Sequence, residues 1–459
     1  MPAAESRQPR QPRQPRQPRL FALLLLLLAV LFARPGQARC IDEQNLETPP
    51  PSASDTTVPD ISAPRLTLQG MVHEALRRSN AIGAARLLAE AAASDAEEAR
   101  AGASPQATLS ATTGGMYGNA PGAASTQGAT ARANLNVSAL LYDAGRTQQI
   151  THWRSRLAES ARLGQLTTQD QIALQTVSLA LDRNRYRLQA QVYQQYERKM
   201  SCLVEALTTI VSADKGRASE LVQARKTLLQ AELLQAQTAS ALSQTNTRLA
   251  RFIGDALPSS EGLSSVLLSL PLLDDVLAEA ERSNEILAQG AAAQGLENYA
   301  KAVVAGQKPQ FNWVLTGAKS VGTGSATSLM AGVSLSIPLL NPGADHSISA
   351  ARKRAEAARL QREDALEARK FRIAEVYEQA ASAFDRARRT VEVVRNSDRV
   401  RNFTLQQWQQ MGRRSLFDVM GAESEHYNLR VAYVNALHDG QQASALLRSL
   451  GLGIGVWLE

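Results

Sequence analysis

Apolar residues recur at every second position over one stretch in the second half of the chain. One set consists of Leu329, Ala331, Val333, Leu335 and Ile337, and the other of Met330, Gly332, Ser334 and Ser336. A period of two predicts a β-strand with one apolar face. Pro338 ends the alternation, and no proline occurs from Gly343 to the C-terminus, so a long helix is expected to follow the strand.

The same strand-to-helix transition occurs earlier in the chain. Residues 131–141 alternate in the same way, and Gly145 then takes the place of Gly343. Two further matches flank this pair: RRSN at 77–80 corresponds to ERSN at 281–284, and GRASELV from Gly216 corresponds to GRRSLFD from Gly412. The pattern therefore predicts an internal duplication with a period of about 200 residues.

The predicted elements follow the same order in both repeats. Each repeat has two shorter helices, a β-hairpin and a pair of long helices, with glycine-rich loops in the hairpins. At about 1.5 Å per residue, each repeat's first long helix would span roughly 100 Å. The predicted segments are a first repeat at 65–253 (hairpin about 106–141, long helices 144–252), a connector at 254–270, a second repeat at 271–450 (hairpin about 310–337, long helices 344–450) and a tail at 451–459.

The N-terminal region has the features of an export signal. Five arginines in a QPR repeat precede an apolar run from Leu20 to Phe32, and Gly36, Gln37 and Ala38 follow. We expect a signal peptide at 1–38 and, because 39–64 is rich in Pro, Ser, Thr and acids, a flexible linker there. No other segment has the 18 to 20 apolar residues that a membrane helix needs. If the protein spans a membrane, its strands rather than its helices must cross the bilayer.

Charge and candidate chemistry argue against several functions. Loss of the leader lowers the formal charge from +7 to +2, because six arginines and Glu5 leave with it, so a nucleic-acid partner is not expected. The five histidines are scattered, without a metalloprotease, CxxC or GxSxG motif. We therefore expect no enzyme activity, no cofactor and no metal. Cys40 and Cys202 are expected as unpaired thiols, with lipidation of Cys40 or a disulfide between the two left open.

Four strands cannot close a barrel, and an open sheet in lipid would leave its edge groups without hydrogen-bond partners. Two chains would give eight strands and a filled interior, whereas three would give twelve strands and room for a passage. We expect an α+β membrane protein: a homotrimer in which four strands per chain form a 12-stranded outer-membrane barrel, continued by an antiparallel coiled-coil helical tunnel in the periplasm.

The paired junctions LLYDAGR and IPLLNPG, the paired helical tips and the duplication resemble the TolC-like outer-membrane efflux protein family over about residues 66–450. The resemblance implies a trimeric channel in the cell outer membrane. It also implies that the channel receives cargo from an inner-membrane pump of the ABC or RND type through a periplasmic adaptor protein.

The resemblance also assigns roles at the helical tips. The carboxylate of Glu220, after Ser219, and Arg414, after Gly412-Arg413, would form a latch that closes the periplasmic aperture. Asp418 would belong to an acidic ring lining the pore. Gln409 stands where the family has a gate tyrosine, and Gly421 where a second acid can occur. The tip turns Gly216, Arg217, Gly412 and Arg413 would contact the adaptor.

Three functions are consistent with this pattern. The absence of an apolar residue three positions before Cys40, and the second tip sequence, favour type I protein secretion over multidrug or small-molecule efflux. A soluble periplasmic coiled-coil scaffold or adaptor is the remaining alternative.

Overall fold

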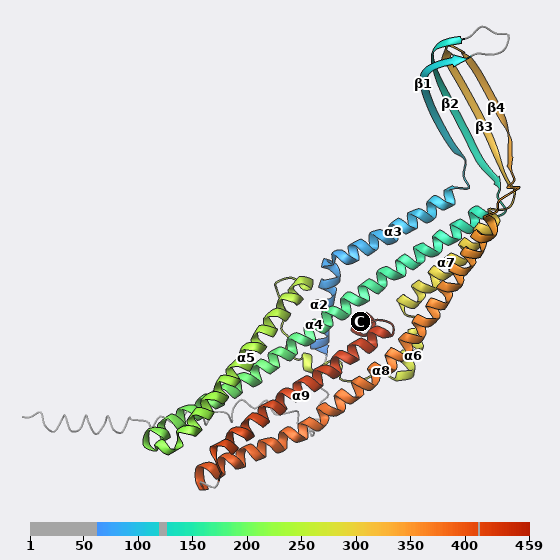
Figure 1. Ribbon diagram of the computed structural model, residues 1–459. Coiled ribbons are helices and arrows are strands. Elements are labelled where there is room, and N and C mark those ends of the chain that lie inside the picture. Colours follow the sequence, from blue (N-terminus) through green and yellow to red (C-terminus); the bar gives the residue numbers. More distant parts are fainter. Residues whose placement is uncertain (1–61, 119–125, 412–413) are drawn as a thin grey trace, which may run out of the picture.

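The computed structural model describes residues 62–118, 126–411 and 414–459; the predicted signal peptide and almost all of the predicted linker lie outside these ranges. A four-stranded sheet stands at one end of an elongated layer of helices (Figure 1). Its strands are β1 (Gln106–Gly118), β2 (Thr126–Tyr142), β3 (Gln310–Gly322) and β4 (Ala326–Ser336). The two predicted hairpins are confirmed, and pairing of β2 with β3 joins them into one antiparallel sheet in the order β1-β2-β3-β4.

The register places the apolar positions of all four strands on one face of the sheet. Leu109 pairs with Leu135, Val137 with Leu315, and Leu315 with Ala331. The opposite face carries polar groups, with the Thr316 hydroxyl 3.4 Å from the Asn136 amide oxygen. A slip of one residue at any pair would move one strand's apolar set to the polar face. Sequence alternation and register therefore agree, except at a β-bulge between Leu140 and Tyr142 on β2.

The helices form two similar sets that extend from one end of this sheet (Figure 1). The first contains α2 (Ser62–Arg78), α3 (Asn80–Ala101), α4 (Arg146–Ala213), the short η2 (Lys215–Arg217) and α5 (Ala218–Ile253). The connector includes η3 (Leu263–Ser265). The second set contains α6 (Leu273–Ala280), α7 (Asn284–Ala305), α8 (Ala344–Gln406), the π-helical turn η4 (Gln407–Met411), α9 (Leu416–Leu450) and α10 (Ile454–Leu458).

The predicted and observed elements differ mainly at their ends. The N-terminal helix starts at Ser62, inside the predicted linker, and the predicted tail contains α10. In the second hairpin β3 ends at Gly322 and β4 begins at Ala326, so the loop between them is short. Across the described ranges, no helix is long and apolar enough to span a bilayer.

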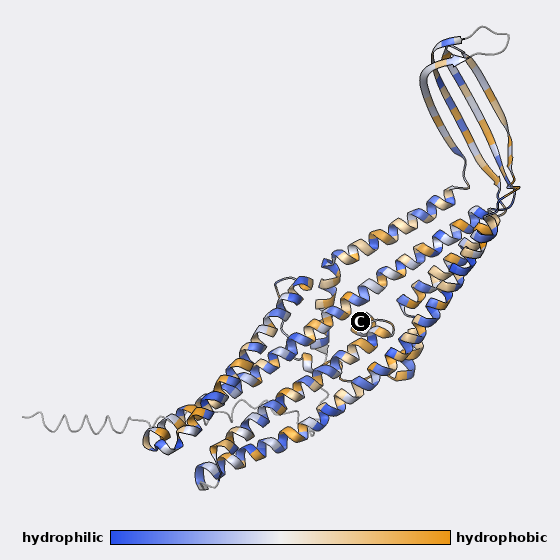
Figure 2. Ribbon diagram, in the orientation of Figure 1, coloured by the Kyte–Doolittle hydropathy of each residue, from blue (hydrophilic) through white to orange (hydrophobic). Residues whose placement is uncertain are grey.

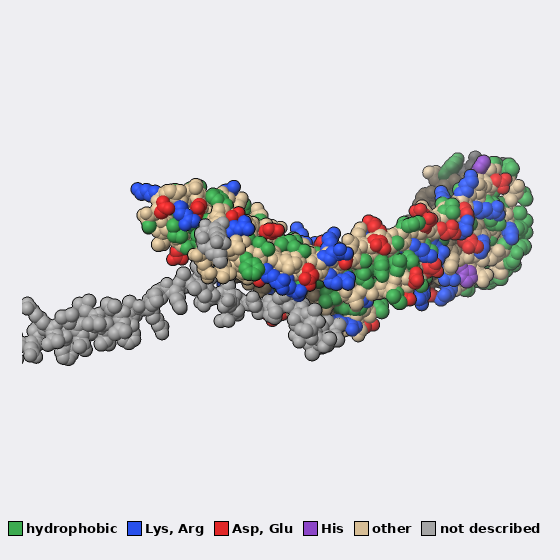
Figure 3. Space-filling view, turned by 90° about the horizontal axis from the view of Figure 1, so that it is seen from below, with side chains coloured by type: hydrophobic (Ala, Val, Ile, Leu, Met, Phe, Trp, Pro, Cys, Tyr) green, Lys and Arg blue, Asp and Glu red, His purple; other side chains and the backbone are tan. Residues whose placement is uncertain are grey.

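The helical layer is held by several small cores rather than one large one. One core joins α2, α4, the end of α5 and α10 through residues such as Leu68, Val177 and Ile454. A second lies near the tips, and a third packs α6 against α8 and α9. Hydrophobic and hydrophilic residues are interspersed along every long helix (Figure 2). Acidic and basic side chains likewise alternate over the face seen in Figure 3. This is the composition of a thin wall with solvent on both sides.

Candidate channel wall and periplasmic aperture

At the first strand-to-helix junction, a single carboxylate caps the start of the long helix. Asp143 accepts hydrogen bonds from the backbone N–H groups of Gly145 (3.0 Å) and Thr147 (2.6 Å), which would otherwise be unsatisfied at the start of α4. Ala144 and Gly145 have φ angles of 54° and 82°, so the chain turns sharply here. At the second junction the N–H of Ala344 donates to the carbonyl of Asn341 at 3.0 Å. Here Gly343 has a φ of −80°, so the two copies turn differently.

Aromatic side chains lie on the apolar face near both ends of the sheet. Trp313 and Phe311 lie near the helical end, with the Phe311 ring 6.1 Å from that of Tyr142. Tyr117 lies at the opposite end of β1 and is exposed. An apolar band between two aromatic girdles is the arrangement found on lipid-facing barrel walls. Trp313 therefore lies where such a wall carries its interfacial aromatic residues.

The tip between α4 and α5 is organised by two carboxylates. Asp214 accepts a hydrogen bond from the backbone N–H of Gly216 at 2.9 Å. Glu220, in the first turn of α5, forms an ion pair with Arg217 at 2.8 Å. Its side chain is 17% exposed, so part of its carboxylate is shielded by the tip. Glu220, expected in the latch, and Arg217, expected to contact the adaptor, thus contact each other within one tip.

The tip between α8 and α9 begins with the π-helical turn η4, a local widening that often occurs at functional sites. Nε of Arg414 donates to the Gln407 side-chain oxygen in that turn at 3.2 Å. Ser415 and Asp418 form a capping box, with Asp418 accepting from the Ser415 N–H (3.1 Å) and Ser415 accepting from the Asp418 N–H (3.2 Å). Gly412 and Arg413 lie outside the described residues.

A fully buried carboxylate lies close to this second tip. Glu423 on α9 is 0% exposed, and its oxygens lie 3.8 Å from Lys199 Nζ on α4 and 3.6 Å from Arg401 Nη1 on α8. Arg401 also pairs with Asp398 at 2.8 Å. An uncompensated buried carboxylate would be costly, and two cations from two different helices offset that cost. Glu423 therefore joins both long helices to α9.

Aromatic and imidazole rings surround this ion pair cluster. Tyr196 stacks on Tyr427 with ring centroids 5.0 Å apart, and its hydroxyl is hydrogen-bonded to Ser424. Burial raises the pKa of Tyr196. His426 lies 3.4 Å from the Ser397 hydroxyl, and burial together with the cations Arg401 and Arg430 lowers its pKa to about 4. His426 is therefore neutral at neutral pH.

Solved structures share this architecture. CusC, described in a study of folding and transmembrane channel formation, superposes with a TM-score of 0.76 over 84% of this chain and 92% of its own, at 16% identity. A membrane protein from Pseudomonas aeruginosa superposes with a TM-score of 0.77 over 84% of this chain and 92% of its own, at 16% identity. The outer membrane protein VceC from Vibrio cholerae superposes with a TM-score of 0.74 over 85% of this chain and 97% of its own, at 16% identity. The chain has the TolC-like outer-membrane channel fold. By sequence, it matches no protein-family model and no curated protein.

Within this TolC-like fold, α4 and α9 meet along a polar seam that continues upward from Glu423. Gln189 donates to Asn435 at 2.6 Å, and His438 Nε2 lies 3.0 Å from the Asp182 carboxylate. By contrast, apolar residues such as Leu207 and Ala231 form much of the contact between α4 and α5. These polar contacts join α4 to α9 above the second core, in which apolar residues of α4, α5 and α9 pack together nearer the tips.

Sequence reasoning missed Glu423 and the seam, although a signal was available. Leu416, Val419, Met420 and Tyr427 form a buried helical stripe on α9, and Glu423 occupies the position within it where an apolar residue is expected. The capping box was also present as the spacing Ser415-x-x-Asp418. An acid in an apolar stripe predicts a buried partner, but the partners come from helices far away in sequence.

The remaining candidate chemistry is limited. Cys202 is disulfide-bonded, so the expectation of an unpaired thiol at this position is wrong; Cys40 lies outside the described residues. Among the described residues, no group of three or more His, Cys, Asp or Glu side chains is placed to hold a metal ion.

Proposed function

We propose that this chain is one protomer of a homotrimeric outer-membrane channel that passes cargo across the periplasm to the cell exterior. The observation that carries the proposal is the apolar face of the four-stranded sheet, on which Leu109 and Leu329 are more than 75% exposed. Such a face is unstable in water and suited to lipid. In a soluble scaffold, this exposed apolar face would be unfavourable.

Unpartnered apolar side chains along the protomer's flanks support the trimer. Leu87 and Leu88 are exposed on α3, Val222 and Leu229 on α5, and Phe371 on α8. The outer strands β1 and β4 have each paired on only one side within the chain. Three copies would cover both kinds of edge and close a barrel of twelve strands with a passage inside.

The helical part would then form the periplasmic tunnel. α4 has 68 residues, which at about 1.5 Å per residue is roughly 100 Å, and α8 is nearly as long. A wall of that length reaches deep into the periplasm, where the tips would meet a periplasmic adaptor and an inner-membrane pump. Gly216 and Arg217, with Gly412 and Arg413, would present the tip turns to the adaptor. Energy for transport would come from the pump.

We assign the channel to type I protein secretion first and to small-molecule efflux second. The first assignment rests on the sequence around Cys40, which lacks a typical lipid-attachment signal, and on the second tip sequence. The pump would be of the ABC type for secretion and of the RND type for efflux. A deletion strain, examined for both secreted proteins and drug susceptibility, separates them. Loss of drug resistance with an unchanged secreted-protein profile would reverse the order.

Membrane fractionation tests the channel itself. The protein is expected in the outer-membrane fraction as a trimer that dissociates on heating in detergent, and the purified trimer should conduct ions in a planar lipid bilayer. Release by osmotic shock in a soluble form, without conductance, would instead support a periplasmic scaffold.

A further inference from the structure

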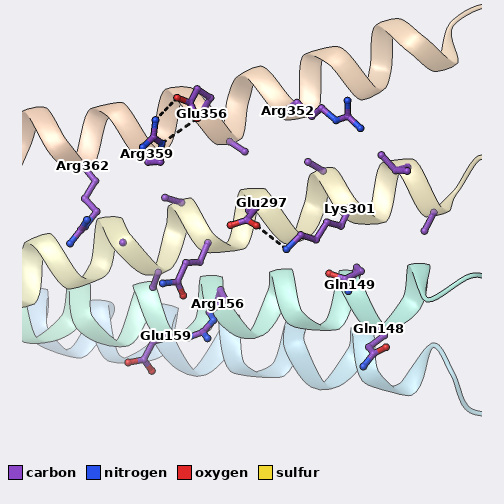
Figure 4. A pocket seen from close by; sticks show the side chains of 18 of the residues that line it. Gln148, Gln149, Arg156, Glu159, Glu297, Lys301, Arg352, Glu356, Arg359 and Arg362 are labelled. Carbon is purple, nitrogen blue, oxygen red and sulfur yellow. Dashed lines mark hydrogen bonds and ion pairs between the residues drawn. The ribbon is translucent and has the colours of Figure 1, made fainter.

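A groove with a volume of about 1270 Å³ lies between α4, α7 and α8 (Figure 4). It is at the end of the helical layer nearest the sheet (Figure 1). Seven basic and three acidic side chains line it. Each acidic side chain is already paired within the groove: Glu159 with Arg162 at 2.9 Å, Glu297 with Lys301 at 2.8 Å, and Glu356 with Arg359 at 2.6 Å. The groove therefore has a surplus of positive charge.

Four cations account for this surplus. Arg156, Lys308, Arg352 and Arg362 belong to none of the ion pairs found in the described part of the chain. Arg156 lies on α4, Arg352 and Arg362 lie on α8, and Lys308 follows the end of α7. Arg362 crosses α7 at Gly290, where an added Cβ would lie 3.4 Å from its Nε. Arg156 likewise packs its Cβ against Gly295. Glycines in α7 thus allow arginines from both neighbours to lie across it.

Two heptad rows show which face of the wall the groove occupies. On α8, Arg352 and Arg359 are followed at the same spacing by Leu366 and Ile373, which pack against α6. On α4, Arg156 and Leu163 are followed by Asp170 and Val177, and Val177 packs in the core that includes α2 and α10. Residues seven apart share a helix face, so the groove and these shorter helices lie on the same side. That side is the outside of the tunnel, because the shorter helices would otherwise obstruct the passage.

The groove lies too far from the bilayer to be a lipid headgroup site. Counting along α8 from Gly343, Arg352 lies about 14 Å and Arg362 about 28 Å below the strand-to-helix junction. A headgroup layer is only about 5–8 Å thick on each side of the hydrocarbon core. The volume of the groove also exceeds the roughly 300–1,000 Å³ typical of small-molecule pockets. Three of the four unpaired cations are arginines, and guanidinium groups bind carboxylates through paired hydrogen bonds, so the groove suits a larger ligand that carries carboxylates.

We propose that this outer groove binds an acidic polypeptide segment of a periplasmic partner, held by Arg156, Lys308, Arg352 and Arg362. The proposal rests on the channel function for the assignment of inside and outside. A partner bound here would contact the tunnel between the membrane and the level of α6, well above the tips. It would therefore hold the channel at a second level along its length.

The test uses the purified full-length trimer in detergent and a fluorescent peptide of about twelve residues rich in Glu, with a Gln-rich peptide for comparison. The groove variant carries Arg156→Gln, Lys308→Gln, Arg352→Gln and Arg362→Gln. A matched control, with the same charge change at exposed sites elsewhere, carries Arg225→Gln, Lys226→Gln, Arg388→Gln and Arg399→Gln. We expect the groove variant to bind the acidic peptide at least tenfold more weakly, the control less than twofold, and high salt to weaken wild-type binding.

Several outcomes would overturn the proposal. Equal weakening in both variants would mean that net charge alone attracts the peptide. Displacement of the peptide by short-chain phosphatidylglycerol at comparable concentration would assign the groove to lipid. A shift of the reversal potential in bilayer recordings of the groove variant would place the groove in the lumen. Failure of the wild-type trimer to conduct would count against the channel function and leave the peptide measurement to be judged by itself.

Discussion

Lys199 Nζ on α4 lies 3.8 Å from Glu423 Oε1 on α9, and both side chains are largely or completely removed from solvent. Because Arg401 on α8 approaches the other carboxylate oxygen, one glutamate connects three of the four helices that form the periplasmic end. Removing one member of a buried charged group leaves the others uncompensated, which costs more than the group contributes as a whole. The cluster is therefore sensitive to change at its central residue.

Replacement Glu423→Gln should destabilise the periplasmic end by about 3 kcal/mol, because two cations lose their shared carboxylate. Thermal unfolding followed by circular dichroism measures the change. Glu425→Gln is the matched control, since Glu425 lies on the same helix but is exposed. Equal loss of stability in the two variants would show that the buried pairing has no special importance.

The folded protein should also become less stable as the pH falls, because His426 has a lowered pKa in the folded state. Its pKa is about 4 in the folded protein against an ordinary value of 6.5, so between these pH values the unfolded chain binds more protons than the folded one. The contribution of a neutral His426 is complete above pH 6.5 and decreases by up to about 3 kcal/mol as the pH falls to 4. His426→Gln should flatten the pH dependence of the unfolding temperature over this window. An unchanged slope would contradict the assignment.

Asp418 has two roles that substitution can separate. Asp418→Asn removes the charge and retains an oxygen for the capping box, so cation preference in bilayer recordings should decrease with little change in stability. Ser415→Ala should reduce stability by about 1 kcal/mol through loss of the cap and leave ion selectivity unchanged. If Asp418→Asn does not alter the reversal potential, Asp418 is a helix cap and not part of a pore ring.

The proposed aperture latch has to compete with contacts inside each tip. Glu220→Ala and Arg414→Ala should each raise single-channel conductance, because each removes one latch partner. Arg217→Ala should lower it or leave it unchanged, since it releases Glu220 from its 2.8 Å ion pair and makes the carboxylate available to Arg414. Arg225→Ala, an exposed site on α5, serves as the control. Unchanged conductance in both Glu220→Ala and Arg414→Ala would remove the latch assignment.

Two adjacent residues in the middle of β3 test the orientation of the sheet. Leu315 lies on the apolar face and Thr316 on the polar face beside Asn136. Leu315→Lys should reduce the amount of assembled trimer, since a lysine on a lipid-facing wall costs about 2–4 kcal/mol at mid-depth. Thr316→Lys should assemble normally and shift ion selectivity toward anions. The reverse result would mean that the two faces are exchanged.

Much of the architecture could be predicted because it follows from local periodicity. The strand at 329–337, its earlier copy and the proline-free long helices each carry their own pattern, so one sequence sufficed to place them within a few residues. The closure argument then led from strands to an oligomeric barrel. At the tips, Ser219-Glu220 and Arg414 could be located by resemblance, but their local partners Arg217 and Gln407 were not foreseen.

The sequence by itself determined the secondary structure, the duplication and the amphipathic character of the strands, because each depends on neighbours within a few residues. Only the tertiary structure decided that β2 pairs with β3, that Glu423 meets Lys199 and Arg401, and that arginines from α4 and α8 converge across the glycines of α7. These contacts join segments far apart in the chain. They depend on how far each helix is rotated and shifted along its axis relative to its neighbours. Small side chains permit several such arrangements, so the sequence alone does not specify which one forms.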